Sequence, residues 1–345
     1  MRIILHIGTE KTGTTTIQEF LHVNRDRLLS DGILVPLSPN ASGLLNHRKL
    51  AVYGCNDTKR DDGRVKLGIT SSSEFRAQFE RDFVKECLES GCDTVVLSSE
   101  HCSSRLRSNE EIERVKTLLD QVGQTTILLY LRPQEEMWKS WYSTSVSIAS
   151  CKPFSAPTRE NRNKLLDYHA LCCSWATAFG TDSLRVRIFA KDEFVDQNLL
   201  RDFVSAAGLT LKWDGIHLPP QRNTSINLKL LEFLRRFNVY LPHMSKRTKF
   251  HPDPLQGDLI KILRRLSQRM PPDVLSREQL EWTAEFSEGN ANVARIFLGR
   301  DDGVLFRDDN ASVRVDTPPP QFNLDDAFEI FAKIWSEKNR PQQNR

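Results

Sequence analysis

Residues 2–16 read RIILHIGTEKTGTTT, the most informative segment of the chain. Residues 2–7 are almost continuously apolar after the arginine, which predicts a strand buried on both faces. Two glycines follow, Gly8 and Gly13, and Thr14 then opens a segment with apolar residues at helical spacing. A buried strand, a glycine-containing turn and a helix in that order aim backbone N–H groups and the positive end of a helix dipole at one point. The stretch therefore predicts a cradle for a phosphate or sulfate group.

Further along the chain, short apolar runs alternate with longer amphipathic segments. The runs at 93–98, 125–131 and 183–189 predict strands, and the last, which alternates, predicts a strand nearer an edge. The amphipathic segments predict helices at 14–29, 74–90, 109–122, 134–147, 164–179 and 198–207. This order is typical of an α/β fold, a three-layer sandwich with a central, mostly parallel sheet.

The domain organisation follows from the same pattern. We expect a single domain over residues 1–340, with its core at about 1–240 and a frayed polar tail at 341–345. From about residue 227 the periodicity is mainly helical, which predicts a helical C-terminal elaboration, at about 241–340.

The charge balance bounds the choice of partners. Net charge is +3, from 48 Lys+Arg and 45 Asp+Glu, and this gives no case for nucleic-acid binding. Between positions 229 and 269, however, the sequence contains ten basic residues and only three acidic ones. That excess indicates either solvated helix faces or a surface for an anionic partner.

The composition also indicates a compartment. No stretch approaches the ~20 apolar residues of a membrane span, and the N-terminal apolar run is too short for a secretory signal. The seven cysteines are odd in number and include no C-x-x-C pair. We therefore expect a reduced, cytoplasmic protein with neither a disulfide framework nor a zinc site.

The glycine spacing invites comparison with nucleotide kinases and ATPases, whose phosphate loop reads G-x-x-x-x-G-K-[ST]. Gly8 and Gly13 are correctly separated, but Thr14 follows Gly13 and the lysine, Lys11, lies inside the turn. The strands at 93–98 and 125–131 do not end in the Asp that holds Mg²⁺ in such enzymes. The turn thus predicts a P-loop-like fold that grips an anion without a metal. A Mg-ATP-dependent kinase with an irregular loop is the alternative.

A family resemblance starts in this loop. The segment TEKTGTT at 9–15 resembles the 5′-phosphosulfate loop of sulfotransferases that use 3′-phosphoadenosine 5′-phosphosulfate (PAPS), particularly bacterial, carbohydrate-type members. The matching positions are Lys11, Thr12, Gly13, Thr14 and Thr15, and Thr16 adds another hydroxyl. The resemblance implies that this loop binds the phosphosulfate and that Lys11 contacts the bridging oxygen as the S–O bond breaks. Ground-state binding of the phosphosulfate is the other interpretation of Lys11.

The second part of the resemblance lies after the predicted strand at 125–131. Arg132 and Pro133 follow that strand, and Ser140 comes eight residues after Arg132. The family has such an Arg and a Ser eight residues later, both binding the 3′-phosphate, and a guanidinium suits phosphate geometry. Arg222 lies in a stretch similar to one that precedes a long helix in bacterial members. It could reach a cofactor phosphate, although a plain helix cap at Asn223 or Ser225 is the simpler interpretation.

Candidate bases follow the strand at 93–98, where Glu100 and His101 reach the same sheet edge. Family members carry a catalytic base near the end of this strand, His in some and Glu in others. Glu100 fits the glutamate version, His101 is the adjacent alternative, and a helix-capping role for Glu100 is a third interpretation. The polar stretch at 46–66 is expected to form a loop over the same edge and to recognise the acceptor.

The resemblance covers about residues 1–240 and implies an enzyme. It implies a sulfotransferase that moves a sulfonyl group from PAPS to a hydroxyl by in-line displacement, with no metal. The acceptor would be a carbohydrate or glycolipid, and the basic region could hold an anionic one. A non-catalytic nucleotide-binding protein of the same fold is a further alternative.

Overall fold

The computed structural model describes residues 1–40, 45–59, 61–219, 226–240, 254–307, 313–315 and 322–338. The chain divides into two compact units. Unit 1 comprises Met1–Arg132, Glu160–Arg222 and Phe286–Arg307; unit 2 comprises Pro133–Arg159, Asn223–Glu285 and Asp308–Arg345. Unit 1 therefore leaves out 133–159 and takes in 286–307, so it does not coincide with the expected core at 1–240. A single domain over 1–340 stays a prediction.

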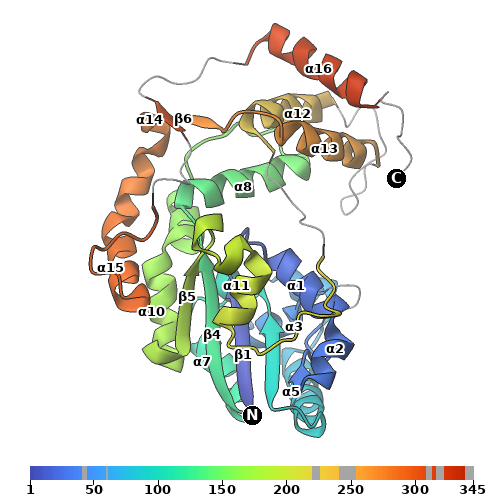
Figure 1. The fold of residues 1–345 in the computed structure, drawn as a ribbon, viewed down its shortest axis with the longest axis vertical. Coiled ribbons are helices and arrows are strands. Elements are labelled where there is room, and N and C mark those ends of the chain that lie inside the picture. Colours follow the sequence, from blue (N-terminus) through green and yellow to red (C-terminus); the bar gives the residue numbers. More distant parts are fainter. Residues whose placement is uncertain are drawn as a thin grey trace. The chain divides into compact units, whose positions relative to one another are not determined.

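Unit 1 is built on a five-stranded, all-parallel sheet in the order β2-β3-β1-β4-β5 (Figure 1). The strands are β1 (Arg2–Gly8), β2 (Ile33–Leu34), β3 (Thr94–Ser98), β4 (Gln124–Leu131) and β5 (Leu184–Ile188). The four predicted strands are confirmed to within one residue at each end, and β5 lies at an edge as expected. β2 was not predicted because two residues are too few to carry a hydrophobic pattern.

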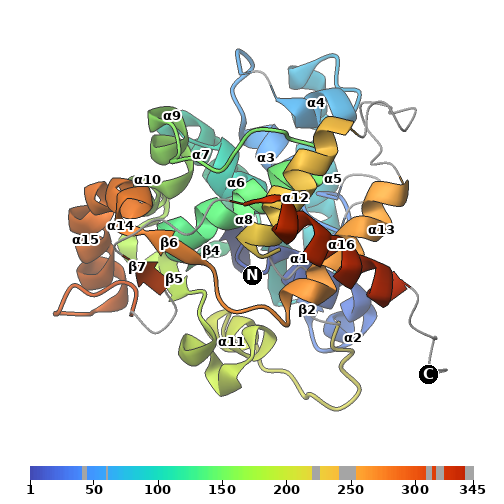
Figure 2. The ribbon, with the colours of Figure 1, turned by 90° about the horizontal axis from the view of Figure 1, so that it is seen from above.

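Helices cover both faces of the sheet, so the α/β class with a central parallel sheet is confirmed (Figure 2). One face carries α1 (Thr14–Val23), α2 (Arg25–Ser30) and α11 (Leu199–Ala206). The other carries α3 (Arg48–Gly54), α5 (Ser72–Glu89), α6 (Glu100–Arg105), α7 (Asn109–Asp120), α10 (Tyr168–Phe179) and α15 (Ser287–Leu298). Shorter helices of unit 1 are α4 (Asp62–Lys66) and a π-helix at Arg162–Leu166.

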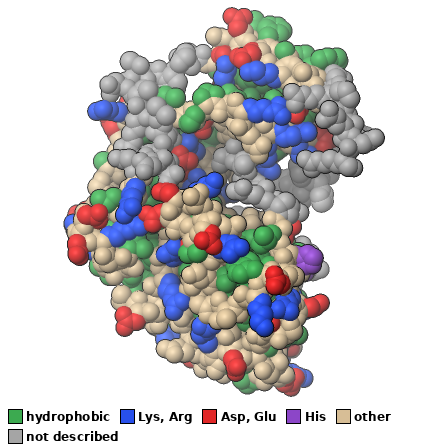
Figure 3. Space-filling model, viewed as in Figure 1, with side chains coloured by type: hydrophobic (Ala, Val, Ile, Leu, Met, Phe, Trp, Pro, Cys, Tyr) green, Lys and Arg blue, Asp and Glu red, His purple; other side chains and the backbone are tan. Residues whose placement is uncertain are grey.

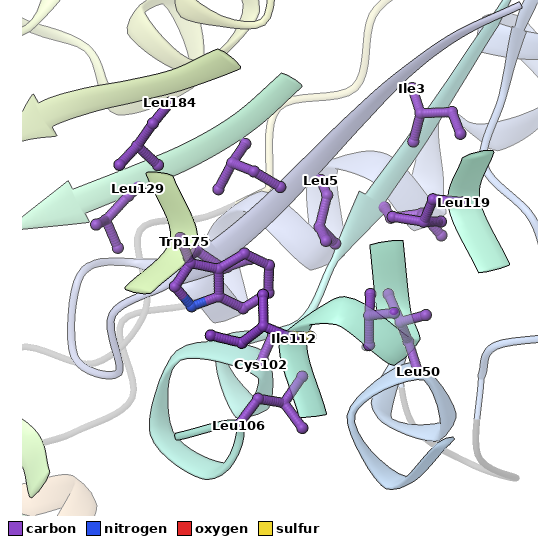
Figure 4. Packing of buried hydrophobic residues seen from close by; sticks show 14 of the residues in the cluster. Ile3, Leu5, Leu50, Cys102, Leu106, Ile112, Leu119, Leu129, Trp175 and Leu184 are labelled. Carbon is purple, nitrogen blue, oxygen red and sulfur yellow. The ribbon is translucent and has the colours of Figure 1, made fainter. Parts of the chain in front are cut away.

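Alternate side chains of β1 point to opposite faces of the sheet and enter the hydrophobic core on each face. Ile4 faces the α1 side, while Ile3 and Leu5 face the α7 side. On the α7 side, Ile112 and Trp175 pack with Leu5, all fully buried (Figure 4). Burying side chains of this size contributes roughly 1.5–3 kcal/mol each. The central strand is thereby fixed from both faces, and the loop that follows it is fixed with it.

Two predicted helices differ from the structure by more than two residues at one end. The helix expected at 14–29 is divided at Asn24, whose backbone N–H and side-chain amide both donate to the carbonyl of Phe20, at 3.2 and 2.8 Å, while its side chain also bonds to the backbone of His217. The helix expected at 164–179 begins at Tyr168, because the Asp167 carboxylate caps it by accepting from Ala170 N at 2.9 Å.

Unit 2 is mainly helical, as expected for the C-terminal region. Its helices are α8 (Gln134–Ser147), α12 (Leu228–Tyr240), α13 (Pro254–Ser267), α14 (Arg277–Leu280) and α16 (Leu324–Lys338), with α9 (Arg159–Asn161) where the two units meet in the chain. A parallel strand pair, β6 (Val274–Ser276) with β7 (Val313–Val315), was not predicted, again because each strand is so short. Among the described helices, none has both the length and the hydropathy that crossing a membrane demands.

Candidate functional site

Three segments of unit 1 meet at the carboxyl ends of adjacent strands. The loop at 9–13 follows β1, Glu100 follows β3, and Arg132 follows β4. Because β1 pairs in parallel with both β3 and β4, these three strand ends lie at the same edge of the sheet. The chain winds in opposite directions on either side of β1, which is where open α/β sheets bind ligands.

The loop after β1 holds its own shape. Gly8 and Gly13 have φ of 90° and 73°, and Lys11 also has a positive φ, 65°. The backbone N–H of Thr9 donates to the carbonyl of Tyr130 at 2.9 Å, and the Thr12 hydroxyl donates to the carbonyl of Thr9 at 2.6 Å. Left-handed residues next to right-handed ones turn successive N–H groups toward a common point, which makes an anion-binding concavity.

The start of α1 completes this concavity. Gly13 occupies the N-cap position, and no described side chain caps the helix. A side chain at Gly13 would collide with Leu199 and come within 3.0 Å of the Phe189 ring. The glycine is therefore required by close packing as well as by its φ, and the first N–H groups of α1 face the loop without a side-chain cap.

The threonines of the loop differ in exposure. Thr12 is fully buried and Thr14 is nearly so, whereas Thr16 is half-buried and Thr15 is exposed. The buried Thr12 hydroxyl shapes the loop through its bond to Thr9. Thr12 would therefore offer a ligand its backbone N–H group rather than its hydroxyl.

Arg132 contacts the loop directly. Its Nη1 donates to the carbonyl of Lys11 at 3.0 Å, and its guanidinium lies 5.7 Å from the centre of the Phe189 ring. The Tyr168 hydroxyl donates to the Arg132 carbonyl at 2.8 Å and fixes the end of β4. The Arg132 guanidinium thus lies against the backbone of the loop that contains Lys11.

Glu100 lies against the base of the loop. A Cβ added at Gly8 would stand 3.0 Å from the Glu100 Cβ, so the glycine makes room for this side chain. Gln18 Nε2 donates to Oε2 of Glu100 at 2.6 Å, and Asn46 Nδ2 donates to Oε1 at 3.4 Å. The side chain is 16% exposed, so the carboxylate is restrained yet reachable from solvent.

His101 has a different environment from Glu100. Its Nε2 lies 3.3 Å from Arg48 Nη1, and its Nδ1 accepts from Arg105 Nε at 3.4 Å. Burial lowers the pKa of His101, the Glu100 carboxylate opposes that shift, and the two guanidinium groups add to it. The two guanidinium groups thus oppose protonation of the imidazole, an arrangement that weakens it as a base.

The stretch at 46–66 was expected as a loop, and that expectation is wrong. It contains the helices α3 and α4, joined by a turn in which the buried Asp61 carboxylate caps α4. Asp61 also accepts from Arg105, and Asp62 pairs with both Arg48 and Arg105. This charge network packs the stretch onto α6 and engages the buried Arg48, whereas the Lys66 side chain is 57% exposed.

Two of the predicted phosphate-binding residues stay predictions. Ser140 lies on α8 in unit 2, where its carbonyl accepts from the Thr144 hydroxyl at 3.2 Å, and its pairing with Arg132 stays a prediction. Arg222 lies outside the described residues. The structure also brings in Gln18 and Asn46, which the sequence did not single out; the one available signal was a glutamine on the apolar face of α1.

The basic region at 229–269 is partly neutralised where it is described. Several Lys and Arg side chains gather over α12 and α13 on the face drawn in Figure 3. Lys229 pairs with Asp326 and Glu329 of α16, and Arg269 pairs with Glu337. Arg235 and Arg236 share Glu232, while Lys246, Arg247 and Lys249 lie outside the described residues. The sequence excess therefore overstates the positive charge of α12.

Comparison with known proteins gives no close match. No family model matches the chain. A protein of Archaeoglobus fulgidus described as uncharacterized is 25% identical over 205 residues, which are 59% of this chain and 54% of that protein, so the chain spans about half the relative's length. The crystal structure of a sulfotransferase from Alicyclobacillus acidocaldarius is 15% identical over 71% of this chain and 96% of its own, with a TM-score of 0.38. A likeness that loose assigns neither the activity nor the site.

Proposed function

We propose that this protein is a sulfotransferase that moves a sulfonyl group from PAPS to a hydroxyl of a carbohydrate or glycolipid. The proposal is carried by one set of contacts at the carboxyl ends of β1, β3 and β4. There a glycine-lined anion loop contains Lys11, the Arg132 guanidinium is bonded to that loop, and the Glu100 carboxylate packs against its first glycine. An anion grip and a base are the two elements that sulfonyl transfer to an alcohol requires.

The donor is anionic at both ends, and the proposal assigns each end a group of residues. The N–H groups at the start of α1 and the hydroxyls of Thr15 and Thr16 hold the 5′-phosphosulfate. Arg132 holds the 3′-phosphate, with Ser140 and Arg222 as predicted partners. No metal is assigned, and a cytoplasmic location stays a prediction.

The chemical step balances with the residues named. A lone pair of the acceptor oxygen forms the new O–S bond while the acceptor proton passes to the Glu100 carboxylate. The bond between sulfur and the bridging phosphate oxygen breaks, and its electron pair leaves with adenosine 3′,5′-bisphosphate. The Lys11 ammonium stabilises the charge that grows on that oxygen.

Calorimetric titration tests donor recognition. We expect adenosine 3′,5′-bisphosphate to bind with a micromolar Kd in the presence of EDTA and ATP not to bind. Arg132→Ala should weaken the bisphosphate about 10- to 100-fold more than adenosine 5′-monophosphate, which lacks the 3′-phosphate, because hydrogen bonds to charged groups have that strength.

The matched control is Arg185→Ala, which removes an exposed guanidinium that also donates to a backbone carbonyl, that of Ala206 at 2.6 Å. It should change neither affinity. If Arg132→Ala weakens the binding of both ligands equally, Arg132 does not bind the 3′-phosphate and only supports the loop. Tight Mg²⁺-dependent binding of ATP would contradict the sulfotransferase proposal and favour the kinase alternative. Incubation of labelled PAPS with a panel of glycosides and glycolipids would then identify the acceptor.

A further inference from the structure

Gln18 is a buried amide among the buried residues of α1. Its neighbours on α1, Ile17 and Leu21, belong to the hydrophobic core, and Gln18 itself is 5% exposed. Burying an amide without a hydrogen bond costs roughly 1–3 kcal/mol. A buried glutamine is therefore tolerated only where its side chain makes a hydrogen bond. Here the bond is the donation from Nε2 to Oε2 of Glu100 at 2.6 Å.

The two oxygens of Glu100 are held unequally. Oε2 receives the short bond from Gln18, whereas Oε1 has the long contact from Asn46 at 3.4 Å and lies 3.9 Å from Nε2 of His101. The strongly bonded oxygen is the anchored one. Oε1 keeps more of its acceptor capacity, and it is the oxygen better placed to receive a proton.

Gln18 is also tied to the anion loop. It lies five residues after Gly13, a little more than one helical turn from the N-terminus of α1. Because the backbone between them is a hydrogen-bonded helix, Gln18 is held at a fixed position relative to the N-terminus of α1. The same helix therefore presents N–H groups to the loop at one end and a carboxylate-binding amide one turn later.

We propose that Gln18 is a positioning residue that anchors Oε2 of Glu100 so that Oε1 faces the acceptor hydroxyl. The inference rests on the proposed sulfonyl transfer. Gln18 neither contacts the donor nor takes a proton; it fixes the base relative to the loop that holds the donor. Removing its N–H group leaves the loop intact and lets the carboxylate rotate away from the productive geometry, which lowers kcat and leaves binding unchanged.

Isosteric variants test this role. Gln18→Met keeps the shape and removes the donor, and we expect kcat for PAPS and the glycoside acceptor to fall about 10- to 100-fold. Gln18→Glu places a second carboxylate beside Glu100 and should cost more. In Gln18→Met, the acceptor KM and the calorimetric Kd of adenosine 3′,5′-bisphosphate should both stay within about twofold of wild type.

The control is Gln121→Met, because Gln121 also donates from its amide to a glutamate, Glu80 at 2.8 Å, but on the exposed surface. It should leave kcat and KM unchanged. A second control exchanges the partners, Gln18→Glu with Glu100→Gln. The amide-to-carboxylate bond is restored in reverse, so the Tm should recover relative to Gln18→Glu alone while transfer stays lost, because the carboxylate now lies on α1.

The outcomes separate the two proposals. Full kcat in Gln18→Met, or a fall in kcat matched by an equal loss of bisphosphate affinity, overturns the positioning role while the sulfotransferase assignment stands. Recovery of transfer in the exchanged double variant overturns it as well. If the wild-type protein neither binds the bisphosphate nor consumes PAPS, the proposed function fails and this inference fails with it.

Discussion

At the scale of single residues, Lys11 shows how the site is built. Its φ of 65° is a left-handed conformation that costs a residue with a Cβ about 1–2 kcal/mol. Glycine would adopt the same backbone without strain. The Arg132 guanidinium supports this conformation through its bond to the Lys11 carbonyl, so the strained turn of the loop is held from the end of β4.

The choice between the two candidate bases is testable by substitution. Glu100→Gln keeps the side-chain shape and removes the carboxylate, and we expect kcat to fall about 10²- to 10⁴-fold, the usual contribution of a general base. His101→Asn should lower kcat much less, because burial and the adjacent guanidinium groups lower the pKa of the imidazole and weaken it as a base. Steady-state kinetics measure both variants, and calorimetry confirms that each still binds the bisphosphate. A larger loss in His101→Asn would reverse the assignment.

At the scale of elements, the sequence predicts what periodicity encodes. Strands of five or more residues and helices of eight or more show their pattern, and α8 is found with the bounds expected, Gln134–Ser147. Helix boundaries that are set by a single polar side chain cannot be read from the hydrophobic pattern. Asn24 divides a helix and Asp167 starts one through bonds to partners that the pattern does not reveal. The two-residue β2 falls below the length at which alternation is visible.

The start of α7 gives a prediction for acid stability. Ser108 and Glu111 form a capping box, and the Glu111 carboxylate accepts from Lys59 and from the backbone N–H groups of Asn56 and Arg107. Burial alone would raise the pKa of Glu111, but these donors lower it to about 2. A carboxyl with a depressed folded-state pKa stabilises the fold above its unfolded value, about 4.3, and loses that contribution as pH falls toward 2.

Glu111→Gln should therefore lower the free energy of unfolding at pH 7 by on the order of 2 kcal/mol and flatten its decline between pH 5 and pH 2. Urea unfolding at several pH values measures both effects. The control is Glu110→Gln, since Glu110 is exposed on the same helix and pairs with Arg114 at the surface. An unchanged slope in Glu111→Gln would show that other carboxylates govern acid unfolding.

At the scale of the whole molecule, the candidate site could be predicted in part. Lys11, Glu100 and Arg132 each follow a strand of a parallel sheet, so topology alone sends them to one edge, and the structure places them there. What sequence could not supply are the supporting contacts. Gln18 and Asn46 reach Glu100 from elements 82 and 54 residues away along the chain, and no local pattern encodes such pairs.

The division into two units also exceeds what periodicity can predict, and it leads to a prediction for cooperativity. Unit 2 has its own hydrophobic core, which includes Leu234, and unit 1 has separate cores, one of which includes Leu118; both leucines are fully buried.

Large-to-small changes at such positions cost about 2–5 kcal/mol. If each core stabilises its own unit, Leu234→Ala should reduce amide-exchange protection in α12 and leave α7 unchanged, and Leu118→Ala should do the reverse. Hydrogen-exchange mass spectrometry reads both helices in one experiment. Equal loss of protection in both helices from either variant would mean that the two cores unfold together, as a single domain over 1–340 requires.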